Sequence, residues 1–180
     1  MRKVTLIMTT SLDGYVCGPD GMATGNTKEP PQLKHWKLDR IRQAGAHLMG
    51  RVTYEQMASF WPSSQDEYAA PMNEIPKVVF SKTLKNADWP TSTIASGDLE
   101  DEISALKAQP GGELIVWGGA RFAQAMVRSD LIDEYVIIKR PIAYGDGKPL
   151  FRDLNQTLEL KTLAVTVFDD GKSLNIYSPR

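Results

Sequence analysis

Three short stretches of the sequence place small or polar residues directly after an apolar run. They are LMGRVTYEQM around Gly50, VVFSKTL around Ser81, and IVWGGARFAQ around Gly118 and Gly119. Glycine has no Cβ to keep a bulky anion away from the main chain, and the free N–H groups at a helix start attract phosphate oxygens. One Gly-Gly pair alone would more often be ordinary turn chemistry. The three stretches together predict a site for a phosphate-bearing ligand.

Two of these donor sets could serve the two phosphates of a dinucleotide, and the third could hold the ribose phosphate that separates NADP from NAD. Arg51 would add a positively charged guanidinium group and Thr53 a hydroxyl group. Ser81 and Lys82 would add further hydrogen-bond donors. The sequence contains neither GxGxxG nor the P-loop GxxxxGK[ST]. The usual Rossmann and NTPase fingerprints are therefore missing.

Other residues with useful chemistry have two interpretations each. Asp13, in SLDG, is either the first residue of an Asp-Gly turn or an acid near a substrate, with Ser11 as its companion. Trp36 could stack on a planar ring, although aromatic residues at helical spacing usually belong to the core.

The soft metal ligands are few and do not form a motif. Cys17 is expected to pack rather than to react, while His35 and His47 are interpreted as a surface residue and a partly packed one. No HExxH or paired CxxC motif occurs, so we expect no metal site.

The composition is that of an ordinary globular protein. The 180 residues are 42% hydrophobic and carry 21 Lys and Arg against 22 Asp and Glu, a net charge of -1 that gives no general attraction to nucleic acid or to an acidic membrane surface. A single cysteine excludes an intrachain disulfide, and the first apolar run breaks too early for a signal peptide or membrane span. We expect one cytoplasmic domain over residues 1–180 that acts on a small molecule.

The elements that must position these residues follow from periodicity. We predict an α/β fold in which a mostly parallel central sheet is flanked by helices and followed by a C-terminal antiparallel hairpin. The apolar segment 135–144 and the final hairpin could supply an edge for a homodimer. The expected strands are 4–8, 46–50, 77–81, 92–96, 113–117, 132–141, 158–168 and 173–179, and the expected helices are 32–44, 51–61, 98–112 and 120–129.

The order of LIMTTSLDGYVCG, HLMGRVTYEQM, KVVFSKTL and LIVWGGARFAQAMV resembles the dihydrofolate reductase superfamily. Within it, SLDG and the late GDGKPLF are more similar to the reductase domain of riboflavin biosynthesis and to its stand-alone bacterial relatives. The resemblance extends from about Lys3 to Tyr177. It implies an eight-stranded, mostly parallel sheet that binds NADPH in an extended cleft.

The resemblance also implies a role for each matching residue. The nicotinamide amide would face backbone at Thr9 and from Val16 to Gly18. Asp13 becomes the catalytic candidate, with Ser11 beside the substrate. Trp36 is a substrate-binding candidate for a separate reason, because its ring could stack on a planar ring. The remaining cofactor contacts would be Gly50, Arg51, Val52 and Thr53 on phosphates, Ser81 and Lys82 on the adenosine side with its 2′-phosphate, and Gly118, Gly119, Ala120, Arg121 and Phe122 on the pyrophosphate.

Folate reductases carry an acid at the start of the first long helix, and the nearest position by spacing here is Lys34. We therefore expect an NADPH-dependent reductase of a small heterocyclic or ribosylamino-pyrimidine substrate, of the 5-amino-6-(5-phosphoribosylamino)uracil reductase type. The alternatives are a dihydrofolate reductase with a displaced acid and a non-catalytic protein that binds NADPH.

Overall fold

The computed structural model describes residues 1–25 and 28–180. Its centre is an eight-stranded sheet with the order β5-β4-β3-β6-β1-β7-β10-β9. A separate pair, β2 with β8, lies beside it. The strands are β1 (Val4–Thr10), β2 (Tyr15–Cys17), β3 (Ala46–Gly50), β4 (Lys77–Phe80), β5 (Ser92–Ala95), β6 (Leu114–Trp117), β7 (Glu134–Lys139), β8 (Lys148–Pro149), β9 (Leu160–Val167) and β10 (Ser173–Pro179).

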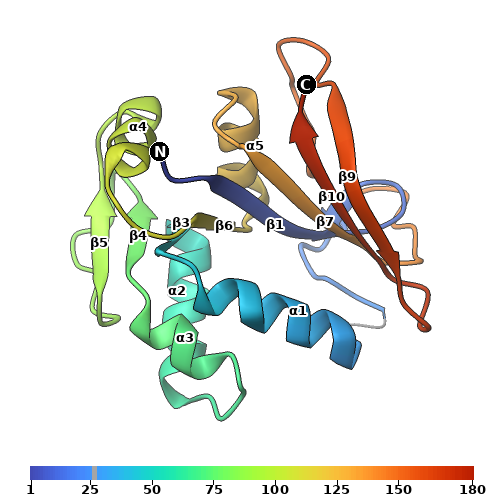
Figure 1. Ribbon diagram of the computed structural model, residues 1–180, viewed down its shortest axis with the longest axis horizontal. Helices are drawn as coiled ribbons and strands as arrows, with labels where there is room; N and C mark the ends of the chain where they lie inside the picture. The colour runs from blue at the N-terminus through green and yellow to red at the C-terminus, as the bar shows by residue number, and fades with distance from the viewer. Residues whose placement is uncertain (26–27) are drawn as a thin grey trace.

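Six neighbouring strands of this sheet, from β5 to β7, are parallel, and β10 and β9 follow in antiparallel pairing. Parallel strands need crossover connections, so helices cover the sheet on both faces (Figure 1). The helices are α1 (Pro31–Arg42), α2 (Arg51–Phe60), α3 (Ala69–Glu74), α4 (Leu99–Ala108) and α5 (Ala120–Arg128), with a 3₁₀ turn at Trp61–Ser63. The predicted fold class is confirmed.

Each face of the sheet has its own core cluster. On one face α4 and α5 bury Ile103 and Met126 against strand residues such as Leu48. On the other face α1 and α2 bury Leu33 and Tyr54. Figure 1 shows α1, α2 and α3 on one side of the sheet and α4 and α5 on the other.

Local signals explain several helix ends. The side chain of Asp98 accepts hydrogen bonds from the N–H groups of Glu100 and Asp101, so it caps α4 as expected. The predicted helix 51–61 ends at Phe60, one residue early, because the 3₁₀ turn takes over at Trp61 and contains Pro62. The sequence analysis did not predict α3 or the two-residue strand β8.

His47 is fully buried, not partly packed as expected. Its Nδ1 accepts a hydrogen bond from Trp117 Nε1 at 2.9 Å, and its Nε2 lies 3.4 Å from the carbonyl oxygen of Pro71. Burial lowers the pKa of His47 to about 4. This histidine is therefore a neutral core residue.

Of the two segments expected to supply a free edge, the final hairpin lies at an edge of the sheet and the segment 135–144 does not. β7 pairs with β1 on one side and β10 on the other, so the segment 135–144 does not offer a free edge as we had expected. The hairpin does, because β9 is the last strand of the sheet and exposes Leu163, Val165 and Val167. Homodimerisation remains a prediction. Over the described ranges, no helix combines the length and the apolar character that crossing a membrane requires.

Candidate functional site

The three predicted donor stretches meet at one edge of the sheet. β4, β3 and β6 are adjacent and parallel, so their carboxyl ends point the same way. Gly50 lies opposite Phe80 in the pairing of β3 with β4, which brings Gly50 and Ser81 close together. In open α/β sheets, ligands bind outside these carboxyl ends.

Two helices begin at this edge with a glycine as their N-cap. Gly50 precedes α2 and Gly119 precedes α5, and neither helix start has a side-chain cap. The first N–H groups of a helix have no partner within the helix, and here no capping side chain satisfies them. With the helix dipole behind them, these two helix starts are suited to an anion.

Thr53 connects the two helix starts. Its side chain is buried, and its hydroxyl donates a hydrogen bond to the carbonyl oxygen of Gly118. Gly119 has φ 115°, and a Cβ there would lie 2.6 Å from Thr53 Oγ1. A Cβ on Gly118 would lie 2.8 Å from the Met8 side chain. Backbone conformation and close packing therefore both favour glycine at position 119.

Phe122, from the stretch around Gly119, packs against the stretches around Gly50 and Ser81. It stacks on Phe80 with ring centroids 5.0 Å apart, and a Cβ on Gly50 would lie 3.1 Å from Phe122 Cβ. A cavity of about 300 Å³ opens beside these rings. It is lined by Phe80, Ser81, Lys82, Ala95, Gly97, Asp98, Leu99 and Phe122.

The polar groups around this cavity are partly engaged. Ser81 Oγ accepts hydrogen bonds from the N–H groups of Thr83 and Leu84, at 3.2 and 3.0 Å. Arg51 donates to Glu55 at 2.7 Å and to Thr83 Oγ1 at 3.1 Å, which joins the start of α2 to the loop after β4. Lys82, Val52 and Arg121 are exposed, whereas Ala120, the first residue of α5, is buried.

Thr9 and Val16 line a second cavity, of about 200 Å³. Three of its lining residues are charged, and the others are apolar or small. Gly18 follows Val16 by two residues and is buried. Its N–H donates a hydrogen bond to the carbonyl oxygen of Met22 at 3.1 Å. The cavity is lined by Thr9, Val16, Ala23, Glu29, Leu33, Ile138, Arg140 and Lys172.

Glu29 is an acid in this cavity that the sequence analysis missed. It accepts hydrogen bonds from Lys37 Nζ at 2.8 Å and from the Tyr68 hydroxyl at 2.7 Å. Lys34, the position chosen by spacing, forms ion pairs with Asp66 and Glu67 instead. The available signal was an acid immediately before the Pro-Pro that opens α1.

Asp13 and Ser11 are bonded into a loop junction. Ser11 Oγ donates to Asp13 Oδ1 at 2.5 Å, and Asp13 accepts from the N–H groups of Tyr144 and Gly145, at 3.2 and 2.8 Å. These bonds, the one from Ser11 above all, lower the pKa of Asp13. Neither residue is among the described residues that line the cavity with Glu29. Their roles in catalysis and substrate binding remain predictions.

Trp36 is not among the described residues that line either of these two cavities. It is half-buried on α1 and packs against the core cluster on that face, with the Arg40 guanidinium 5.5 Å from its ring centre. Its substrate-binding role remains a prediction.

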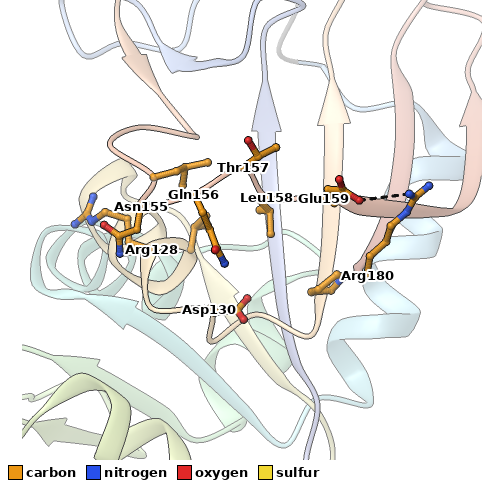
Figure 2. A pocket seen from close by; sticks show the side chains of 11 residues that line it. Arg128, Asp130, Asn155, Gln156, Thr157, Leu158, Glu159 and Arg180 are labelled. Atoms are coloured by element: carbon orange, nitrogen blue, oxygen red, sulfur yellow. Dashed lines mark hydrogen bonds and ion pairs between the residues drawn. The ribbon is translucent and has the colours of Figure 1, made fainter.

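A third cavity, of about 370 Å³, lies at the opposite end of the sheet. Figure 2 shows it between the end of α5, the segment 154–159 and the last residues of the chain, with Glu159 and Arg180 joined by an ion pair. The residues that line it include none of the predicted site residues.

Comparison with known proteins gives consistent matches over the whole chain. A family model described as the RibD C-terminal domain matches residues 2–174. The uncharacterized protein YyaP of Bacillus subtilis is 28% identical over 181 residues, which cover 98% of this chain and 94% of YyaP. The crystal structure of a putative riboflavin biosynthesis protein from Shewanella sp. PV-4 is 26% identical with a TM-score of 0.77, and the match covers 100% of this chain and 99% of that chain.

More distant structures share the fold. A Thermotoga maritima diaminohydroxyphosphoribosylaminopyrimidine deaminase/5-amino-6-(5-phosphoribosylamino)uracil reductase is 17% identical with a TM-score of 0.73, and the match covers 99% of this chain but 57% of that protein. A dihydrofolate reductase from Enterococcus faecalis, solved with NADP(H), is 15% identical with a TM-score of 0.67, and the match covers 99% and 96% of the two chains.

Proposed function

Since the chain belongs to the family of the RibD C-terminal domain, we propose that it is an NADPH-dependent reductase of the riboflavin type. Its substrate is a small heterocycle or a ribosylamino-pyrimidine. The observation that carries the cofactor assignment is the meeting of two uncapped helix starts, those of α2 and α5, at the Thr53–Gly118 contact.

The residues at this edge fit the phosphates of NADPH. The first turns of α2 and α5 supply main-chain donors for the diphosphate. Lys82 and Arg51 lie next to the cavity by Phe80 and Phe122 and supply positive charge for the 2′-phosphate. Arg121, at the start of α5, adds a further exposed cation.

The cavity with Thr9 and Val16 receives the substrate ring, and the nicotinamide lies at its mouth. When bound, the reduced nicotinamide supplies the hydride from its C4. The chain's own contribution is alignment, because the reacting atoms must approach to roughly 3–3.5 Å. Leu33 and Ile138 form apolar walls that exclude water from the reacting faces.

The proposal is tested by mixing the protein with NADPH and a ribosylamino-pyrimidine, and following the loss of the reduced nicotinamide absorbance. We expect oxidation that depends on both enzyme and substrate. Binding of NADPH without oxidation, across a panel of heterocycles and simple ketones, would instead support the non-catalytic alternative. Absence of NADPH binding would overturn the proposal.

A further inference from the structure

The cavity between the end of α5, the segment 154–159 and the end of β10 has no part in the function proposed above (Figure 2). Its floor is apolar and continuous with the core. Val127 is 4% exposed and belongs to the core cluster on that face of the sheet, and Leu154 and Leu158 pack against the same cluster. An apolar part of a ligand would therefore be shielded from water there.

Four charged side chains line this cavity, and the chain leaves two of them unpaired. Glu159 and Arg180 form an ion pair of 3.4 Å, which the dashed line in Figure 2 marks. Arg128 and Asp130 take part in none of the ion pairs found among residues 1–25 and 28–180. Their side chains form no hydrogen bond in that part of the chain either. The cavity thus presents one positive and one negative charge to a ligand.

Arg128 and Asp130 are not placed to pair with each other. Arg128 is the last residue of α5, and Asp130 follows two positions later with φ 52°. Side chains two positions apart at a helix end do not face each other. In the view of Figure 2, Arg128 lies beside Asn155, and Gln156 lies between it and Asp130. The two charges therefore suit a ligand that carries opposite charges at its two ends.

The wall between these charges offers hydrogen-bonding groups that the chain does not use. Within the described ranges, neither the main chain nor the side chains of Asn155, Gln156 and Thr157 form a hydrogen bond. Exposed main-chain groups of this kind pair with the main chain of an added peptide. The two amide side chains each donate and accept, as a peptide group does.

A buried donor lies close to the same cavity. Tyr135 is fully buried in the core cluster that contains Val127, and its hydroxyl has no partner among the described residues. Burial and, to a smaller extent, the charge of Asp130 raise the pKa of this hydroxyl. The end of the cavity at Asp130 is therefore near a donor that an acceptor atom of a ligand would satisfy.

The size of the cavity limits the length of the ligand. It measures about 370 Å³, whereas an engineered cavity of roughly 150 Å³ holds one benzene molecule. A ligand with two apolar side chains fits this space, and a single small amino acid would leave much of it unfilled.

We propose that this cavity is a second ligand site, which binds a dipeptide with free ends and apolar side chains. The carboxylate of the dipeptide faces Arg128, and its ammonium group faces Asp130. Its side chains lie on the apolar floor, and its peptide group lies beside Asn155 and Gln156. A simple anion would leave Asp130 unpaired, and a simple cation would leave Arg128 unpaired.

The test compares leucyl-leucine with two capped forms, N-acetyl-leucyl-leucine and leucyl-leucinamide. Each is titrated into the wild-type protein at neutral pH and low ionic strength by ligand-observed NMR. Each cap removes one charge, so each should weaken binding about threefold to fivefold, as expected for exposed ion pairs. Undetectable binding of leucyl-leucine, or equal affinities for the free and capped forms, would overturn the proposal. Free leucine that binds as tightly as leucyl-leucine would contradict the dipeptide assignment.

Two variants assign the ends of the ligand to named side chains. In Arg128→Gln, leucyl-leucine and leucyl-leucinamide should bind equally, because the partner of the carboxylate is gone. In Asp130→Asn, leucyl-leucine and N-acetyl-leucyl-leucine should bind equally for the corresponding reason. A variant that weakens all three ligands by the same factor would contradict its assignment.

Arg152→Gln and Asp169→Asn are the matched controls. Both remove an exposed charge that is not on the cavity wall, and both should bind the three ligands like the wild type. Thermal melting checks that every variant is folded, and asparagine tolerates the positive φ at position 130. If a variant does not fold, the three titrations of the wild-type protein still decide the matter. The proposal is independent of the cofactor, so a failure of NADPH to bind would leave it standing.

Discussion

The hydroxyl of Thr53, in the first turn of α2, donates a hydrogen bond to the carbonyl oxygen of Gly118, directly after β6. This contact fixes the start of α2 against the start of α5. Both helix starts lack a side-chain cap and point their free N–H groups toward the same edge of the sheet. The relative placement of two donor sets thus depends on one hydroxyl group.

Thr53→Val should lower the free energy of unfolding by about 1 kcal/mol, because it leaves the Gly118 carbonyl without its donor while preserving side-chain shape. It should also weaken the binding of NADPH. Urea denaturation and nucleotide titration measure the two effects. Ser59→Ala, which removes an exposed hydroxyl from the same helix, is the control and should change stability by less than about 0.5 kcal/mol. Wild-type affinity and stability in Thr53→Val would contradict this account of the contact.

Gly119→Ala should be more damaging to nucleotide binding. The new Cβ would lie 2.6 Å from Thr53 Oγ1, in addition to the strain of a φ of 115°. Gly145→Ala is a matched control, since Gly145 also has a positive φ of 74° but a Cβ there meets nothing within 4 Å. Both variants should lose about 1–2 kcal/mol of stability through backbone strain. Only Gly119→Ala should lose most of its NADPH affinity, and equal nucleotide affinities in the two variants would argue against a cofactor at this corner.

The sequence could predict this corner because each signal there is local. A buried run followed by Gly-Gly, or by Gly-Arg-Val-Thr, marks a strand that turns into a helix, and parallel pairing then brings such ends together. The Thr53–Gly118 bond joins residues 65 positions apart. The sequence could therefore predict the donors but not the contact that aligns them.

Lys82→Ala should reduce affinity for NADPH about tenfold and leave affinity for NADH nearly unchanged. The reason is that one charge-assisted hydrogen bond to the 2′-phosphate is worth roughly 1.5 kcal/mol. Lys85→Ala, at an exposed lysine in the same segment, controls for general loss of positive charge. Titrations with both nucleotides decide the matter. Equal losses for NADPH and NADH would mean that the 2′-phosphate lies elsewhere.

Asp13→Ala should loosen the junction between the loop after β1 and the loop after β7. The carboxylate accepts from the main-chain N–H groups of Tyr144 and Gly145, so hydrogen exchange at these two amides should accelerate. Asp20→Ala removes an acid that accepts from a nearby turn amide, that of Met22, and should leave Tyr144 and Gly145 unchanged. Unaltered exchange in Asp13→Ala would show that the carboxylate does not order the loop.

His47 should make the protein sensitive to acid. Its pKa is about 4 in the fold and 6.5 as a free side chain, so the unfolded chain binds the extra proton between these values. Stability from this residue is complete above pH 6.5 and is lost as the pH falls toward 4, by roughly 3 kcal/mol. His47→Leu should be less stable at neutral pH, because Trp117 loses its acceptor. Its stability should nevertheless fall less steeply in this range, and parallel pH profiles of the two proteins would contradict the assignment.

Two features could not be predicted from the sequence because they depend on distant packing. Glu29 stands outside the predicted helix, and its position in a cavity follows from contacts with Lys37 and Tyr68. The complete burial of His47 depends on Trp117 and Pro71, which reach it from another strand and another helix. Neither contact leaves a short-range pattern in the sequence.

The central claim is that the uncapped starts of α2 and α5 bind the phosphates of NADPH. Thermal melting of the wild-type protein with NADPH, with NADH and with neither tests it most directly. NADPH at about 100 times its dissociation constant should stabilise the fold by about 2.7 kcal/mol, with a smaller effect from NADH at the same concentration. An unchanged melting temperature at saturating NADPH would contradict the claim.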